Sequence, residues 1–139
     1  MITLGDDNTG RKNTPVITYA FILLNIFVFF LELAGGEQFI MKWAFIPDRF
    51  LDDPTAGVPT LFSSMFMHAG WGHLIGNMLY LWIFGDNVED RFGKIKFIIF
   101  YLICGIAATL AQLTFNPGSK IPNVGASGAI AGVLGAYIL

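Results

Sequence analysis

Residues 16–34 read VITYAFILLNIFVFFLELA, a long apolar run whose most polar members are Asn25 and Glu32. A helix needs about 20 mostly apolar residues to cross the hydrocarbon core of a bilayer, and this run is long enough to do so. The residues before it are polar, and no cleavage site of small residues follows it, so a signal peptide is not indicated. The stretch therefore predicts a membrane-spanning helix that stays in the protein and ends at Gly35-Gly36.

Three more apolar segments follow, and they predict an all-α fold, a polytopic bundle of membrane helices. We expect spans at residues 16–34, 71–88, 94–114 and 127–139, with residues 35–70 as an outer loop. The composition agrees, because 55% of the residues are hydrophobic and only 13% are charged. Soluble domains carry about twice that charged fraction.

The last apolar run is short for a span. At ~1.5 Å per residue, residues 127–139 make about 20 Å of helix, whereas the hydrocarbon core is ~30 Å thick. No polar or basic flank follows the run. We therefore expect residues 1–139 to be the N-terminal part of one membrane domain, cut within its fourth span.

Basic residues indicate how the chain is oriented. Arg11 and Lys12 precede the first span, and Arg91, Lys94 and Lys96 lie between the second and third. The loops on the other side carry fewer basic residues over a greater length: Lys42, Arg49 and Lys120. Because lysine and arginine favour cytoplasmic loops, we expect a cytoplasmic N-terminus in a prokaryotic plasma membrane, with Ser127 toward the outer face.

The outer loop has its own apolar pattern. Residues 38–51, QFIMKWAFIPDRFL, mix aromatic and aliphatic side chains with a few charges, which is typical of a segment that lies in the membrane interface. Residues 60–67 form a second apolar piece, which we expect to be a short helix leading into the next span.

Composition also argues against some partners and cofactors. A net charge of -2 does not favour nucleic acid, and the lone Cys104 allows no intrachain disulfide and no CxxC metal motif. The chain has two histidines, His68 and His73. We expect no metal and no cofactor.

Polar residues within the apolar spans are the candidates for function, since burying them costs free energy. His73 and Asn77 stand four residues apart and so share one face of the second span. Ser127 begins the fourth span at the same predicted depth. The topology therefore brings these three residues together near the outer leaflet.

These residue types suit acyl transfer. A serine attacks a carbonyl, and hydrogen-bond donors stabilise the oxyanion that forms. The Ser127 N–H lies at a helix N-terminus, where free amides favour negative charge, and His73 and Asn77 offer side-chain donors. A general base for the serine is not evident in the chain.

Each of these residues also has a plain structural interpretation. Ser127 fits an N-cap or a packing residue of a glycine-rich helix, Asn77 an interhelical hydrogen bond, and His73 a core histidine. Gly128 and Gly132 form a G-x-x-x-G pattern, which we interpret as helix packing. The order Gly125-x-Ser127-Gly128 lacks the flanking strand of a hydrolase nucleophile elbow.

Taken together, the motifs resemble those of the rhomboid family of intramembrane serine proteases. The pattern is His68-(x4)-His73-(x3)-Asn77 on the second span, with Gly125-Ala126-Ser127-Gly128 at the start of the fourth. Residues 89–93, EDRFG, are similar to the family's E-x-R-x-G segment.

The resemblance implies a rhomboid-like bundle of six or more spans that cleaves transmembrane protein substrates in the lipid bilayer, by a Ser–His dyad without metal or cofactor. It implies Ser127 as the nucleophile and His73, Asn77 and the Ser127 N–H as the oxyanion hole. Supporting roles fall to His68, Gly125 and Gly128, and structural roles to Glu89, Arg91 and Gly132. The dyad histidine of the family lies on a later span, so the chain is expected to be inactive without the missing C-terminal spans.

Two other functions remain open from the sequence. A rhomboid-like pseudoprotease would bind transmembrane clients without cleaving them, although such a protein has no chemical need for all of Ser127, His73 and Asn77. A transporter or structural membrane protein would favour charges or broken helices near mid-bilayer, a pattern the sequence does not show.

Overall fold

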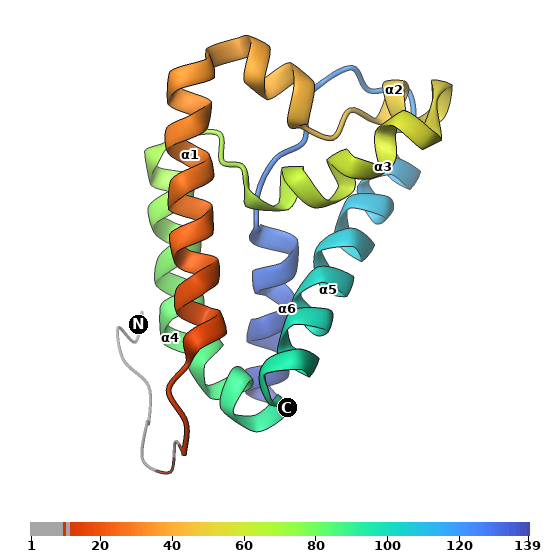
Figure 1. Ribbon diagram of the computed structural model, residues 1–139. Coiled ribbons are helices and arrows are strands. Elements are labelled where there is room, and N and C mark those ends of the chain that lie inside the picture. The colour runs from red at the N-terminus through yellow and green to blue at the C-terminus, as the bar shows by residue number, and fades with distance from the viewer. Residues whose placement is uncertain (1–9, 11) are drawn as a thin grey trace.

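The computed structural model describes Gly10 and residues 12–139, and within these residues the fold is all-helical (Figure 1). Arg11, one of the basic residues behind the predicted orientation, lies outside the described residues. The elements, in chain order, are α1 (Val16–Trp43), α2 (Pro47–Asp52), α3 (Pro54–Ser63), the short 3-10 helix η1 (Ser64–Phe66), α4 (Trp71–Phe92), α5 (Lys94–Phe115) and α6 (Ser127–Ile138). The all-α prediction is therefore confirmed.

Two of these helices, α1 and α5, are long and apolar enough to cross a membrane, and α6 is a shorter apolar helix. The expected spans at 71–88 and 127–139 are also helical, but they do not meet the same criterion. The helix α4 is long enough but is less apolar than α1 and α5, since it contains His73, Asn77, Asp86 and Asn87, and α6 is short.

The expected outer loop is largely helical. At Gly36 the backbone leaves helical geometry, with φ 59° and ψ -148°, and the chain then resumes a helix that reaches Trp43. Glycine adopts such a positive φ at little cost, which explains a sharp kink at this position. The second part of α1, with α2 and α3, runs across one end of the upright helices (Figure 1).

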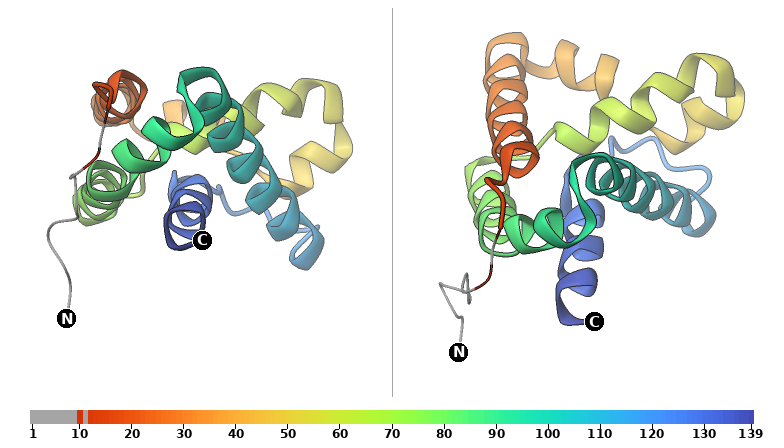
Figure 2. Two further views of the ribbon diagram at one scale, coloured as in Figure 1. Left: turned by 90° about the horizontal axis from the view of Figure 1, so that it is seen from below. Right: turned by 60° about the horizontal axis from the view of Figure 1, so that its bottom comes forward.

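The helix α6 lies between α4 and α5, while α1 packs on α4 (Figure 2). Gly128 faces Ala108 of α5, and a β-carbon added to Gly132 would come within 2.5 Å of the Cys104 sulfur. The glycines thus let two backbones approach closely, as a G-x-x-x-G packing motif does. A neighbouring side of α6, which includes Ala131 and Gly135, is exposed in the described part of the chain.

Glu89 joins the end of α4 to the start of α1. Its carboxylate accepts hydrogen bonds from the Ile17 N–H (2.9 Å), the Thr18 N–H (2.7 Å) and the Thr18 hydroxyl (2.8 Å). The helix α1 has no side-chain cap of its own, because Pro15 occupies its N-cap position. Glu89 therefore satisfies free amides at the positive end of the α1 dipole.

The two residues after Glu89, Asp90 and Arg91, differ in their contacts. Asp90 accepts backbone hydrogen bonds from Lys12 and Asn13, at 2.9 to 3.2 Å, and so extends the same junction. Arg91 is exposed, and within the described residues it makes no hydrogen bond or ion pair.

Candidate active site

Ser127 is the first residue of α6, and its side chain is exposed. The N-cap position belongs to Ala126, which makes no side-chain cap, so the N-cap interpretation of Ser127 does not describe its place in the helix. The first helical hydrogen bond around this turn runs from the Ile130 N–H to the Ala126 carbonyl (2.9 Å). The Ser127 N–H lies ahead of that bond, at the end of the helix that favours negative charge.

The segment before Ser127 is held from two sides. Phe45 and Asn123 form an antiparallel β-bridge, with N···O distances of 2.7 and 3.2 Å. Two residues further on, the Gly125 N–H donates to the Ser64 carbonyl (2.9 Å). The backbone of the approach to the serine is therefore held by the outer segment.

The side chains of His73 and Ser127 both lie close to Gly125. A β-carbon built on Gly125 would lie 3.1 Å from His73 Nε2 and 3.7 Å from Ser127 Oγ. Its φ of 133° also lies in the region that favours glycine. The imidazole and the hydroxyl thus flank a space that only a residue without a side chain leaves open.

The hydrogen bonding of His73 indicates which ring nitrogen carries the proton. The Ala69 N–H donates to His73 Nδ1 over 3.4 Å, a long contact. A nitrogen that accepts a hydrogen bond is unprotonated in the neutral ring, so the proton belongs on Nε2. Nε2, the atom beside Gly125, is then a donor.

Asn77 follows one helical turn after His73 on α4 and is half-buried. Its Nδ2 is buried, and the residues that the structure describes offer it no hydrogen-bond partner. An unpaired buried donor costs about 1–3 kcal/mol, which makes this amide available to an acceptor that enters the site.

The ring of His68 packs against the ring of His73. Its ring is buried and meets the His73 ring edge to face, with centroids 5.0 Å apart and planes at 72°. Burial, and secondarily the charge of nearby His73, lowers the pKa of His68 to about 4, so it is neutral at pH 7. Its backbone N–H donates to the Glu32 carboxylate at 2.9 Å.

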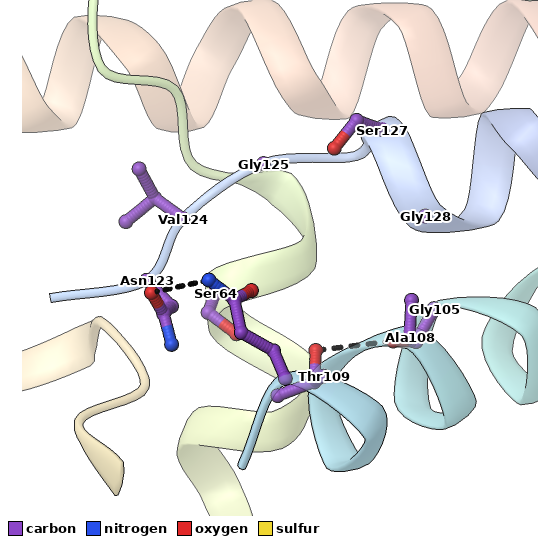
Figure 3. Close-up of a pocket in the computed structure, with 10 residues that line it drawn as sticks. Ser64, Gly105, Ala108, Thr109, Asn123, Val124, Gly125, Ser127 and Gly128 are labelled. Carbon is purple, nitrogen blue, oxygen red and sulfur yellow. Dashed lines mark hydrogen bonds between the residues drawn. The ribbon is translucent and has the colours of Figure 1, made fainter. Parts of the chain in front are cut away.

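A cavity of about 110 Å³ lies beside Ser127, between α5 and the segment that leads into α6 (Figure 3). Its polar lining comes from Ser64, Thr109, Gln112 and Asn123. The Gln112 side chain donates to the Asn123 side chain at 3.1 Å. Sequence reasoning missed these four residues, because they lie on separate elements and form no local motif.

Within Gly10 and residues 12–139, no three His, Cys, Asp or Glu side chains gather as a metal site. His73 and Ser127 lie beside Gly125, Gln112 and Asn123 line the cavity next to Ser127, and Asn77 stands one turn along α4 from His73. Such a set suits nucleophilic attack with hydrogen-bond stabilisation of an anion.

Comparisons with known proteins show what the chain is similar to. Residues 56–139 match the Rhomboid domain family. The chain is 35% identical to the rhomboid protease GluP of Bacillus subtilis over 92% of its own length and 25% of that protein. It is 31% identical to the mitochondrial Rhomboid protein 1 of Saccharomyces cerevisiae, over 93% of its length and 37% of the relative.

A further relative is the rhomboid protease GlpG of Klebsiella pneumoniae, which is 32% identical over 78% of the chain and 38% of that protein. The chain thus spans between a quarter and two fifths of the length of these curated relatives. A match to the domain over more than half of the chain, with relatives over nearly its whole length, settles the classification: the chain belongs to the rhomboid family.

Proposed function

We propose that this protein is an intramembrane serine endopeptidase that cleaves transmembrane protein substrates, and that the present chain supplies its nucleophile and oxyanion donors. One observation carries the proposal. His73 Nε2 and Ser127 Oγ flank Gly125, and the Asn77 amide nitrogen, which has no partner among the described residues, lies one turn after His73 on α4.

In the proposed reaction the Ser127 hydroxyl attacks the carbonyl carbon of the scissile peptide bond and passes its proton to a general base. The carbonyl oxygen becomes an oxyanion, which His73 Nε2–H, the Asn77 amide and the Ser127 N–H stabilise. The intermediate collapses to an acyl-enzyme as the protonated amine leaves, and water then releases the acid. Each donor is worth on the order of 3 kcal/mol in the barrier.

The base is proposed to be a histidine on a later span. His68 is enclosed, and His73 Nδ1 accepts the Ala69 N–H while Nε2 serves as a donor. The exposed side of α6, with Ser127, Ala131 and Gly135 at successive turns, offers small residues against which another helix can pack closely. Residues 1–139 alone are therefore expected to be inactive.

The wider architecture is part of the same proposal. We treat α1, α4, α5 and α6 as four membrane spans of a single domain. The whole domain is proposed to contain six or more spans and to be embedded in the bilayer. Lys12, Arg91, Lys94 and Lys96 lie at the end of the bundle away from Ser127, which supports a cytoplasmic location for that end. The active site then faces the outer leaflet of a prokaryotic plasma membrane.

The test uses the full-length protein in liposomes and a fluorophosphonate probe that reacts with activated serines. Labelling at Ser127, located by mass spectrometry and lost in Ser127→Ala, is the expected result. Ser119→Ala is a matched control and should label normally, since Ser119 lies in the loop before the site. If folded protein is not labelled, the function is instead that of a pseudoprotease that binds transmembrane clients.

A further inference from the structure

Glu32 is a carboxylate buried within an apolar helix. It is 4% exposed, and its hydrogen-bond partner is the backbone N–H of His68, which follows 36 residues later in the chain. Placing such a group inside a membrane span is costly, and such residues usually serve a purpose. The proposed chemistry does not use Glu32, because it touches none of the reacting groups.

The His68 N–H that donates to Glu32 belongs to a short non-helical link. Residues 67–70 join η1 to α4; the Met67 N–H donates to the Ser64 carbonyl of η1 (3.3 Å), whereas the amides of His68 and Ala69 donate to side chains. The Glu32 carboxylate fixes the N–H of His68 at 2.9 Å. The next amide along the chain, that of Ala69, donates to His73 Nδ1.

These two contacts form a continuous connection from α1 to the site. The carboxylate sets the position of one peptide group, and the adjoining peptide group reaches His73. The Ala69 contact is long, at 3.4 Å, so a small displacement of the link would break it. The edge-to-face contact between the rings of His68 and His73 adds a second connection through the same residue.

We propose that Glu32 is a positioning residue that keeps His73 in the Nε2–H tautomer. Without its acceptor, the link shifts, Nδ1 loses its donor, and the proton distributes between the two ring nitrogens. The molecules with a bare Nε2 then present a lone pair, rather than a donor, beside Gly125. The tautomer itself does not depend on the proposed function, whereas its effect on catalysis rests on it.

Nitrogen-15 NMR of the full-length protein in micelles, labelled at histidine, reads the tautomer directly. The His73 signals are assigned by their loss in His73→Gln. The wild type should show a protonated Nε2 and an unprotonated Nδ1. Glu32→Gln keeps an oxygen acceptor of the same shape and should show the same pattern, and Glu32→Leu should show a mixture of both tautomers.

Asn25→Leu is the matched control. Asn25 is another buried polar residue of α1, but its amide donates to the Phe21 carbonyl of its own helix (2.7 Å). Its loss should change stability without changing the His73 signals. Should Glu32→Leu not fold, Glu32→Ser replaces it, because serine is too short to reach the His68 N–H.

Cleavage of a transmembrane substrate supplies the second readout. Glu32→Leu should lower kcat about 5- to 10-fold and leave KM nearly unchanged, a part of the ~100-fold effect of losing an oxyanion donor. Glu32→Gln should restore kcat. A folded Glu32→Leu variant with the wild-type tautomer and wild-type kcat would overturn the proposal.

The NMR and cleavage experiments distinguish failure of the protease function from failure of the positioning role. If the wild type neither cleaves nor reacts with the fluorophosphonate, the protease function is wrong, and the NMR experiment still decides the role of Glu32. If the wild type cleaves but Glu32→Leu keeps its tautomer, the positioning role alone is wrong.

Discussion

The imidazole of His73 lies directly against Gly125: a β-carbon at that glycine would sit 2.8 Å from Cε1 of the ring. Real β-carbons do not approach other atoms so closely, so this contact exists only because residue 125 has no side chain. The contact places the His73 ring of α4 beside the hydroxyl of Ser127, the first residue of α6.

Gly125→Ala should therefore strongly reduce cleavage by the full-length protein. The new methyl group would push His73 away from Ser127, and the φ of 133° would add strain of about 1–2 kcal/mol. We expect a loss of at least ~100-fold in kcat, as for removal of a donor. Gly118→Ala is the control, because a β-carbon there meets nothing within 4 Å. Equal activity of the two variants would contradict the proposed role of the space at Gly125.

Asn77→Ala should fold normally and cleave slowly. The amide has no partner among the described residues, so its removal breaks no internal hydrogen bond. Loss of one oxyanion donor should lower kcat about 100-fold, with KM little changed. Asn77→Asp, which has the same shape, should be equally slow because an ionised carboxylate cannot donate. The role fails if either variant cleaves at the wild-type rate.

Glu89→Ala should destabilise the bundle, because three donors at the start of α1 lose their acceptor. Charged hydrogen bonds contribute about 1.5–3 kcal/mol each and do not add fully, so we expect a total loss of about 3 kcal/mol. Glu89→Gln should lose less. Thermal unfolding in detergent measures the effect. Arg91→Ala, which changes an exposed residue without partners in the described structure, should shift stability by less than about 0.5 kcal/mol.

His68 should make stability depend on pH. Its folded-state pKa of about 4 lies below the ordinary 6.5, chiefly because the ring is buried. Between these values the unfolded chain binds a proton that the folded chain does not, so stability is full above pH 6.5 and falls as the pH drops toward 4. His68→Gln should reduce the slope of unfolding temperature against pH across this window. An unchanged slope would show that His68 is not buried as a neutral ring.

The helices were predictable because long apolar runs and the glycines that end them are local signals. The predicted spans 94–114 and 127–139 differ from the observed helices by single residues at their ends. The predicted end of the first span at Gly35-Gly36 coincides with the kink at Gly36, but a second helix that reaches Trp43 follows it instead of a loop. Whether a chain stops or turns at such a glycine depends on what the following residues pack against, and the local sequence does not reveal that.

The candidate site was predictable in part for the same reason. A four-residue spacing places His73 and Asn77 on one face, and topology brings Ser127 to their depth. The Glu32 contact with His68 and the bridge between Phe45 and Asn123 were not predictable, because each joins residues far apart in the chain. No periodicity in the sequence encodes such pairings.

The bridge between Phe45 and Asn123 has a mechanical consequence. Together with the Gly125–Ser64 hydrogen bond, it ties the strand-like approach to the serine to two points on the outer segment. The position of Ser127 along the bundle axis is therefore determined in part by the position of that segment. Tilting or lifting the outer segment is expected to move Ser127, the proposed nucleophile, relative to the proposed donors on α4.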